Sequence, residues 1–336
     1  MGPGTTDRRR AAVFALVVAA CAVVAVVAMV SDARSGRSTS KASAGAREAL
    51  PAAQAGHRPV AVFLAGDDGG DDRVAIAPLA APDGRRMLAP LRCARVSFSA
   101  GGSGICLARR RGFAAGYAAK VFGPDLRVRR TVPVEGIPSR ARVSPDGRYG
   151  AVTLFVSGDS YAEPGRFSTR TTIIDLARGR RVAELEDFAV VHGERRVTAV
   201  DVNFWGVTFA RDSDRFFATL ATGGRTYLLE GSVRGRAARV IHENVECPSL
   251  SPGGTRIAFK RRTGSAEVPW RLTVLDLRTM RETPLAEVRS VDDQAEWLDD
   301  GHVLYGNGEE TWTVPADGSG SPARYLPAAG SPAVAR

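Results

Sequence analysis

Short apolar segments separated by tight polar turns recur along the chain from about residue 59 to its end. The clearest turn lies in SPDGRYGAV at 144–152, where Pro145 presets the first corner, Asp146 suits the second and Gly147 can take the left-handed conformation of a bulged hairpin. The segment SPGGTRIAF at 251–259 repeats it, and looser copies stand at 99–107, 210–219 and 298–306. Each copy predicts two antiparallel strands joined by a tight turn.

A second pattern follows the first: an alternating apolar strand, a basic or glycine-rich turn, and another strand. Its best copies are RTTIIDLARGRRVAEL at 170–185 and RLTVLDLRTMRETPL at 271–285. Similar segments occupy 73–91, 117–134, 225–241 and 310–326. Together the two patterns predict repeated units of four short strands.

The spacing of these units points to a known architecture. Turns that begin at 99, 144, 210, 251 and 298 are 45, 66, 41 and 47 residues apart. Four short strands in about 40–50 residues is the period of a propeller blade. The first strand, 59–66, occupies the second place in its blade, and SPAVA at 331–335 fits the vacant first place. We therefore predict an all-β, six-bladed β-propeller closed by its C-terminal strand, which leaves no exposed sheet edge at the joint.

These segments carry a family resemblance. The SPDG-type hairpin followed by a TVLDL-type strand resembles the TolB-like propeller proteins with WD40-like (PD40) repeats, over about residues 58–336. The resemblance implies the fold, and it implies a binding or envelope-assembly role only weakly, because the N-terminal domain of TolB is replaced by a different segment.

That N-terminal segment predicts a membrane anchor. An uninterrupted apolar run occupies 11–30 and matches the thickness of a hydrocarbon core. We predict a cytoplasmic tail at 1–10, a transmembrane helix or uncleaved signal anchor at 11–30, a flexible linker at 31–57 and the propeller at 58–336, outside the cytoplasm. VAAC at 18–21 resembles a lipoprotein cleavage box with Cys21 as the lipidated residue, and the alternative is a small residue within a helix.

Composition agrees with an exported globular domain. The chain is 44% hydrophobic and 24% charged, with a net charge of +10. In the propeller, Cys93 and Cys106 are expected on the first two strands of one blade, joined by a glycine-rich turn, so they could form a disulfide. The alternative is two small buried residues. Cys247 is expected to be a buried free thiol.

The motifs of common enzymes are absent from the sequence. It contains no G-x-S-x-G, H-E-x-x-H or G-x-x-x-x-G-K-[ST], and its four histidines are scattered. The acidic segment 67–73 departs from the ligand pattern of a calcium loop, so a solvated turn is expected there. We expect no catalytic residue, metal, cofactor or nucleic-acid partner.

Propeller topology separates the charged residues into two sets. Turns in a four-stranded blade alternate between two faces, and the longer insertions fall on one of them, where binding residues tend to lie. The acidic partner-binding set expected on that face is Asp67, Asp68, Asp159, Tyr161, Glu163, Glu246, Asp292 and Asp293. The basic membrane-proximal set expected on the opposite face is Arg178, Arg180, Arg181, Arg234 and Arg236.

The sequence leaves three classes of function open. The first is a membrane-tethered, monomeric module that binds an envelope protein or peptide, with anionic lipid or wall polymer as further partners. The second is a propeller enzyme of the lactonase or glycan-acting type, whose metal would need carboxylates such as Glu246, Asp292 and Asp293. The third is a sensor of cell-wall polymers.

Overall fold

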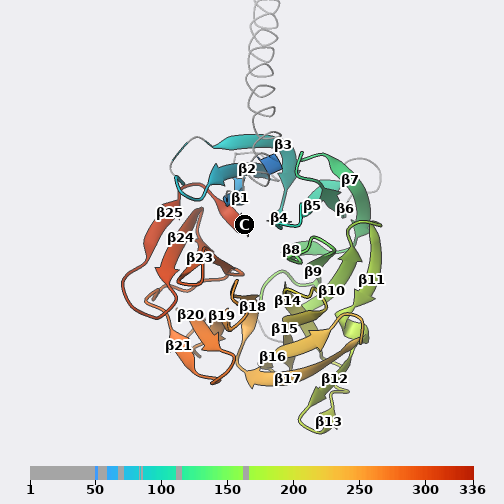
Figure 1. Ribbon diagram of the computed structural model, residues 1–336. Coiled ribbons are helices and arrows are strands. Elements are labelled where there is room, and N and C mark those ends of the chain that lie inside the picture. Colours follow the sequence, from blue (N-terminus) through green and yellow to red (C-terminus); the bar gives the residue numbers. More distant parts are fainter. Residues whose placement is uncertain are drawn as a thin grey trace, which may run out of the picture.

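The computed structural model describes residues 50–51, 59–66, 72–82, 84, 86–110, 116–161 and 166–336. These residues form six sheets that surround a central axis like the blades of a propeller (Figure 1). The predicted six-bladed fold is confirmed. The predicted tail, the apolar segment 11–30 and most of the linker lie outside the described residues. Within the described ranges, no helix has both the length and the apolar character needed to cross a membrane.

Blades 1 and 2 come from the two ends of the sequence. Blade 1 contains, from the axis outward, β26 (Gly330–Ala335), β1 (Val60–Ala65), β2 (Asp72–Pro78) and β3 (Met87–Cys93). Blade 2 contains β4 (Arg95–Phe98), β5 (Gly104–Arg110), β6 (Gly116–Phe122) and β7 (Val128–Val134). The predicted closure is confirmed, because β26 pairs antiparallel with β1 in the register Val60↔Ala335 and Val62↔Ala333.

Blades 3 and 4 carry the longest insertions. Blade 3 contains β8 (Ile137–Val143), β9 (Tyr149–Ser157), β10 (Ser168–Asp175) and β11 (Arg180–Glu184). A 3-10 turn, η1 (Leu185–Asp187), leads onward. Blade 4 contains β14 (Asn203–Phe209), β15 (Arg215–Thr222), β16 (Arg225–Ser232) and β17 (Ala237–Glu243), followed outward by β12 (Ala189–His192) and β13 (Arg195–Arg196).

Blades 5 and 6 follow the regular pattern. Blade 5 contains β18 (Glu246–Leu250), β19 (Arg256–Arg262), β20 (Trp270–Asp276) and β21 (Glu282–Pro284). Blade 6 contains β22 (Glu296–Trp297), β23 (His302–Asn307), β24 (Glu310–Pro315) and β25 (Ala323–Leu326).

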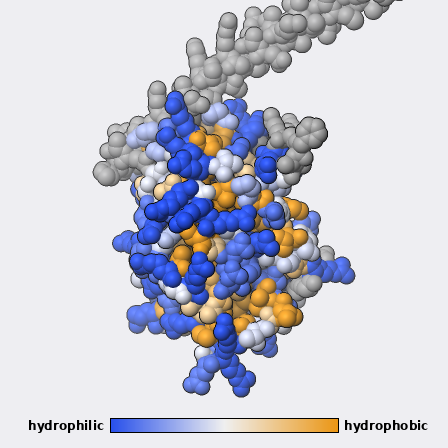
Figure 2. All heavy atoms as spheres, turned by 90° about the vertical axis from the view of Figure 1, so that its right-hand side faces the viewer, coloured by the Kyte–Doolittle hydropathy of each residue, from blue (hydrophilic) through white to orange (hydrophobic). Residues whose placement is uncertain are grey.

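The insertion at 188–203 differs from the sequence expectation. We expected a long loop on one face, but β12 pairs in parallel with β17 at the outer edge of blade 4. Buried Phe188 and Val190 anchor it to the blade. The hairpin protrudes at the lower edge of the ring in Figure 1, and the same end is hydrophilic in Figure 2. The insertion therefore widens a blade instead of covering a face.

The predicted tight turns form through local hydrogen bonds. In the turn of blade 3, the Gly147 N–H donates to the Ser144 carbonyl at 2.8 Å, and Gly147 has a φ of 73°. Asp146 Oδ1 accepts from the Arg148 N–H at 2.9 Å and from the Ser144 hydroxyl at 2.7 Å. Ser251 and Gly254 repeat the same main-chain bond in blade 5. We call the side that carries these turns the hairpin face.

Apolar side chains fill each space between neighbouring blades. Ile105 and Leu107 of blade 2 pack with Val143 and Val152 of blade 3, and equivalent clusters occupy the other five spaces. Leu50 is fully buried in the cluster between blades 1 and 2. Residue 50 belongs to the stretch expected to be a free linker, so the propeller domain begins to pack earlier in the chain than residue 58.

Candidate functional site

The side opposite the hairpin face, here called the loop face, is formed by the connections 157–168, 222–225, 243–246 and 291–295. Its most prominent feature is a buried aromatic cluster. The side chain of Tyr161 stacks on Trp205 with ring centres 4.8 Å apart, and it contacts Phe155 and Phe167 at 4.7 and 5.3 Å. Its hydroxyl lies 2.5 Å from the Ser139 hydroxyl. The insertion after β9 therefore folds inward and packs Tyr161 over the inner strand β8.

Two cationic side chains lie against this aromatic cluster. The Arg140 guanidinium and the Lys260 ammonium both lie 5.3 Å from the ring centre of Tyr161, and Lys260 lies 4.1 Å from that of Trp270. Both cations also pair with Asp292, at 3.2 Å from Arg140 and 2.5 Å from Lys260. Burial would raise the pKa of Asp292, but the charges of Lys260 and Arg140 hold it below the usual range. Asp292 is therefore ionised and already neutralised within the fold.

Glu246 belongs to the same network. Its side chain is fully buried, pairs with the guanidinium of Arg262 and lies 4.0 Å from the Lys260 ammonium. Arg262 also donates to the main-chain carbonyl of Tyr161 at 2.8 Å. This carboxylate is therefore paired within the fold and is not accessible from solvent.

These contacts revise the predicted partner-binding set. Tyr161 and Glu246 are buried, so their side chains cannot contact a partner on this surface. Asp292 is half exposed and ion-paired, and the carboxylate of Asp293 accepts from the main-chain N–H groups of Gly306 and Gln294. Asp159 is exposed at the end of the β9 loop. The remaining members, Asp67, Asp68 and Glu163, lie outside the described residues.

The same contacts bear on the carboxylates considered for a metal. Glu246 and Asp292 each lie against Lys260 and an arginine, so these carboxylates already face cations of the protein itself. In the described part of the chain, no group of three or more His, Cys, Asp and Glu side chains is arranged to hold a metal ion. Arg140 and Lys260 could not be recognised from sequence patterns, because their partner Asp292 is distant in the chain.

A pocket opens beside the aromatic cluster, between the β9 insertion and the inner edge of blade 4. Its volume is about 520 Å³. Phe167 and Trp205 form its wall together with Ala221 and Val202, and Val200 stands fully exposed at its rim. The pocket therefore combines a rigid aromatic wall, fixed by the core, with an apolar side chain that is open to solvent.

The polar side chains of this pocket differ in how they are satisfied. Asp201 accepts from the Thr222 hydroxyl at 2.6 Å and from the Gly223 N–H at 2.7 Å, and these hydrogen bonds lower its pKa. Asn203 Oδ1 accepts from the Thr169 N–H at 2.8 Å. The exposed Arg225 side chain, in contrast, has no hydrogen-bond or ion-pair partner among the described residues. The pocket thus offers a free cation next to an apolar wall. None of its residues had been singled out from the sequence.

The basic membrane-proximal set lies on the hairpin face, in the turns after β10 and β16, and part of its charge is compensated. Arg178 pairs with Asp175 at 2.7 Å, and Arg234 pairs with Asp214 at 3.1 Å. Arg181 and Arg236 donate to main-chain carbonyls at 2.7 Å. Arg180 is exposed. The aspartates of the turns belong to the same face, so the basic character of this face is weaker than the sequence indicated.

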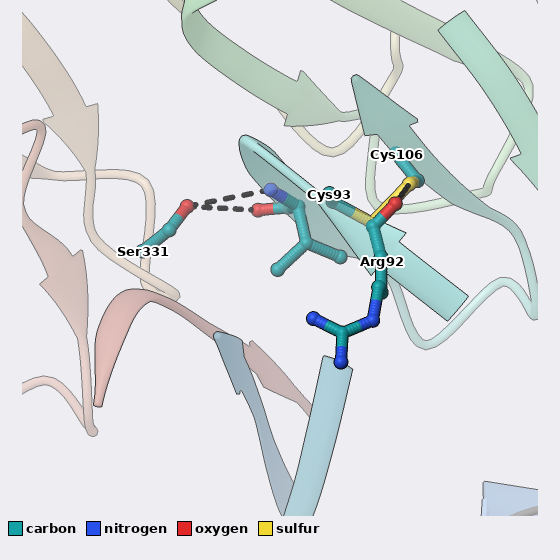
Figure 3. The surroundings of a disulfide bond; sticks show 5 residues. Arg92, Cys93, Cys106 and Ser331 are labelled. Atoms are coloured by element: carbon teal, nitrogen blue, oxygen red, sulfur yellow. Dashed lines mark hydrogen bonds between the residues drawn. A yellow bond between two sulfur atoms is a disulfide. The ribbon is translucent and has the colours of Figure 1, made fainter. Parts of the chain in front are cut away.

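A disulfide joins the cysteines that the sequence singled out (Figure 3). Cys93 and Cys106 are bonded, with Cα atoms 5.4 Å apart. Cys93 ends β3 of blade 1, however, and Cys106 lies in β5 of blade 2, so their expected placement in one blade was wrong. The chain passes from β3 to β4 through Ala94 alone, which brings Cys93 beside the second strand of the next blade. Nearby, Ser331 Oγ accepts from the Val96 N–H at 3.4 Å and donates to its carbonyl at 3.2 Å.

Comparisons with known proteins support the fold. No protein-family model matches the chain, and no curated protein matches its sequence. TolB from Acinetobacter baumannii superposes with a TM-score of 0.54 at 14% identity, over 83% of this chain and 67% of TolB. A chain of the nidogen/laminin complex gives 0.56 at 10%, over 83% and 98%. The tricorn protease gives 0.51 at 9%, over 82% of this chain and 30% of the protease. The chain therefore has a TolB-like propeller fold.

Proposed function

We propose that this protein is a membrane-tethered, extracytoplasmic propeller that binds a protein or peptide partner through its loop face. The observation that carries the proposal is the pocket of about 520 Å³ beside Trp205, with exposed Val200 at its rim and unpaired Arg225 within reach. Concave apolar sites with a few placed polar groups are where ligands commonly bind. Val200 adds an exposed apolar side chain at the rim of this site.

The groups of this pocket define the chemistry of the partner. Val202 and Ala221 on the wall and Val200 at the rim suit an apolar side chain of the partner, and Arg225 suits a carboxylate next to it. The acidic side chain nearest to Arg225 in the pocket, Asp201, is already occupied by Thr222 and Gly223. We therefore favour a peptide segment that presents an apolar residue beside Asp, Glu or a C-terminal carboxylate.

Selection of peptides from a displayed random library on the immobilised full chain tests this proposal. Bound peptides should combine an apolar residue with a neighbouring acid. Val200→Asp and Arg225→Glu should each weaken their binding at least about tenfold, which corresponds to about 1.4 kcal/mol. Arg130→Glu, an exposed arginine on the outer strand of blade 2, is the matched control and should bind normally. Peptides that bind all four proteins equally would contradict the assignment.

The tether and the membrane-proximal face complete the proposal. The strand β1 begins at Val60 beside Ala335, so the chain enters its first strand on the hairpin face, after Leu50 has packed between blades 1 and 2. The loop face then points away from the lipid, toward an envelope protein or wall polymer. Basic groups gain about 1 kcal/mol each near anionic lipid. Flotation of the protein with vesicles should rise with the fraction of anionic lipid. It should fall in the variant in which five arginines become Gln: Arg178, Arg180, Arg181, Arg234 and Arg236. Equal flotation of the parent and this variant would contradict a membrane contact through the basic set.

A further inference from the structure

Three arginines, Arg95, Arg140 and Arg142, lie on inner strands near the propeller axis, and Arg140 and Arg142 each pair with a carboxylate. Arg95 of β4 donates to the main-chain carbonyls of Ser139, at 2.7 Å, and Ala94, at 2.8 Å, and to no carboxylate among the described residues. Burial and the neighbouring charge of Arg140 lower its pKa. A cation whose pKa is lowered lies in surroundings that disfavour its charge. Arg95 is therefore a candidate for an external counter-charge.

The two arginines of β8 also have unused donors. The Nε groups of Arg140 and Arg142 are buried and have no hydrogen-bond partner within the described structure. Arg140 itself is buried, while Arg142 donates to the Ala295 carbonyl at 2.9 Å and pairs with Glu296. A buried N–H that lacks an acceptor is destabilising, so such groups usually mark an unseen water or ion.

A small cavity lies between these arginines. Its volume is about 20 Å³, and its walls include Arg95, Arg140 and Arg142 together with Asp293, Gln294 and Ser331. This is room for a single occupant of about the size of a water molecule. The oxygens and donors of the other walls are engaged: Gln294 Nε2 donates to the Val207 and Pro248 carbonyls, and Asp293 accepts two main-chain N–H groups. A surplus of donors thus surrounds the space.

The charges of the connected network are also unequal. It contains five cationic side chains, which are Arg95, Arg140, Arg142, Lys260 and Arg262. It contains four carboxylates, which are Glu246, Asp292, Asp293 and Glu296. One positive charge remains, and because Arg140 and Lys260 are buried, an anion that compensates this charge would stabilise the network.

We propose that the cavity between Arg95, Arg140 and Arg142 binds one monovalent anion of halide size. Water would need acceptors for its two hydrogens, whereas the walls offer mainly donors; an anion needs donors alone. Carboxylate and phosphate groups are larger than the space. An anion held between these guanidinium groups would fix the Arg140 side chain, which pairs with Asp292 and lies against Tyr161 on the loop face.

Crystals of the full chain grown in sodium bromide give the direct test. A single anomalous peak should appear in the cavity, within hydrogen-bond distance of at least two of the three guanidinium groups. A second measurement follows the midpoint of thermal unfolding at constant ionic strength, while gluconate, which is too large for the cavity, is replaced by chloride. At chloride concentrations well above the dissociation constant of the site, the midpoint of thermal unfolding should rise by about 2 °C for each tenfold increase in chloride.

Arg95→Gln supplies the variant, and Arg130→Gln is its exposed matched control. Arg95→Gln should abolish the chloride dependence and should be at least as stable as the parent in gluconate, because it removes the uncompensated charge. Arg130→Gln should keep the dependence. If Arg95→Gln does not fold, the bromide peak and the parental chloride dependence decide the question. The absence of an anomalous peak, or a midpoint independent of chloride in the parent protein, overturns the proposal.

Discussion

The tight turns of the hairpin face and the ion pairs at the centre of the loop face satisfy their carboxylates over very different distances in the sequence. On the hairpin face, Asp146 binds groups of residues 144 and 148, and Asp276 accepts from the N–H groups of Arg278 and Thr279. On the loop face, Asp292 pairs with Arg140, which is 152 residues away, and with Lys260, which is 32 away. Local contacts define a turn independently of the rest of the chain. Distant contacts form only once the ring is assembled, so the arrangement of side chains on the loop face depends on the whole fold.

The largest effect is expected at the joint where the two ends of the chain meet. Deletion of 331–336 removes most of β26, of which residues 332–335 are buried, and leaves the inner edge of β1 unpaired. Lost burial and about four main-chain hydrogen bonds, at about 1 kcal/mol each, predict a loss of 5 kcal/mol or more. Denaturant unfolding of the full chain and of the deletion variant measures this loss in the free energy of unfolding. A deletion with the parental midpoint would show that the ring is not closed by this strand.

The next largest effect is expected on the loop face. Tyr161→Ala removes a buried ring from contact with Trp205, Phe155 and Phe167, and we expect a loss of about 4 kcal/mol. Tyr161→Phe keeps the ring and removes only the hydrogen bond to Ser139, so it should lose about 1 kcal/mol. Chemical denaturation of both variants separates the packing contribution from the hydrogen bond. If Tyr161→Ala unfolds at the same denaturant concentration as the parent, Tyr161 is not packed on β8.

The disulfide should contribute next. Cys93 and Cys106 are separated by 13 residues, and a closed loop of this length stabilises a protein by about 3 kcal/mol. Replacing both cysteines with alanine should lower the free energy of unfolding by about 3 kcal/mol, and the midpoint of thermal unfolding should fall accordingly. Reductant should lower the parental midpoint and leave that of the double variant unchanged, which provides the internal control. If reductant does not change the midpoint of thermal unfolding of the parent, the disulfide between Cys93 and Cys106 does not form.

Glu186 gives the loop face a distinct dependence on pH. Burial raises the pKa of this carboxyl from 4.5 to about 7. One oxygen accepts from the Thr171 N–H at 2.9 Å, and the other is buried without a partner among the described residues. The folded state therefore holds a proton more tightly than the unfolded state. This stabilisation is complete below about pH 4.5 and is lost as the pH rises through 7.

Thermal unfolding between pH 5 and 8 tests this expectation. The parent should lose about 2 kcal/mol over that range, whereas Glu186→Gln, which mimics the protonated carboxyl, should lose much less. Glu184→Gln, at a neighbouring partly exposed acid, is the matched control and should follow the parent. Parallel pH profiles of the parent and Glu186→Gln would show that this carboxyl is ionised throughout.

The smallest effect is expected from a single turn of the hairpin face. Asp146→Ala removes the acceptor of two local hydrogen bonds and should lower the stability by about 1 kcal/mol, whereas Asp146→Asn should retain most of it. Denaturant unfolding under the conditions used for the Tyr161 variants allows a direct comparison. A loss as large as that of Tyr161→Ala would abolish the distinction between local and distant contacts.

This distinction also explains which features could be predicted. The turns around Gly147 and Gly254 depend on residues within each turn, so the sequence pattern revealed them, their period and the closing strand. The pairing of Arg140 with Asp292, the buried position of Tyr161 and the parallel pairing of β12 depend on contacts between separate segments. Charge counts from sequence likewise placed Asp292 and Glu246 on a binding surface, although Asp292 pairs with cations of blades 3 and 5 and Glu246 pairs with Arg262 of its own blade. Leu50 was assigned to the linker because its apolar partners lie in blades 1 and 2.

Closure by β26 also constrains the order in which the molecule folds. Blade 1 receives its inner strand from 330–335, so during synthesis or export β1 has no inner neighbour until nearly the whole propeller has emerged. Contacts between such distant segments form slowly. Until β26 pairs with β1, the inner edge of β1 is unpaired and can associate with other chains. The bond between Cys93 and Cys106 joins segments that emerge close together, so it can hold blade 1 against blade 2 during that interval. The first blade begun is therefore the last blade completed.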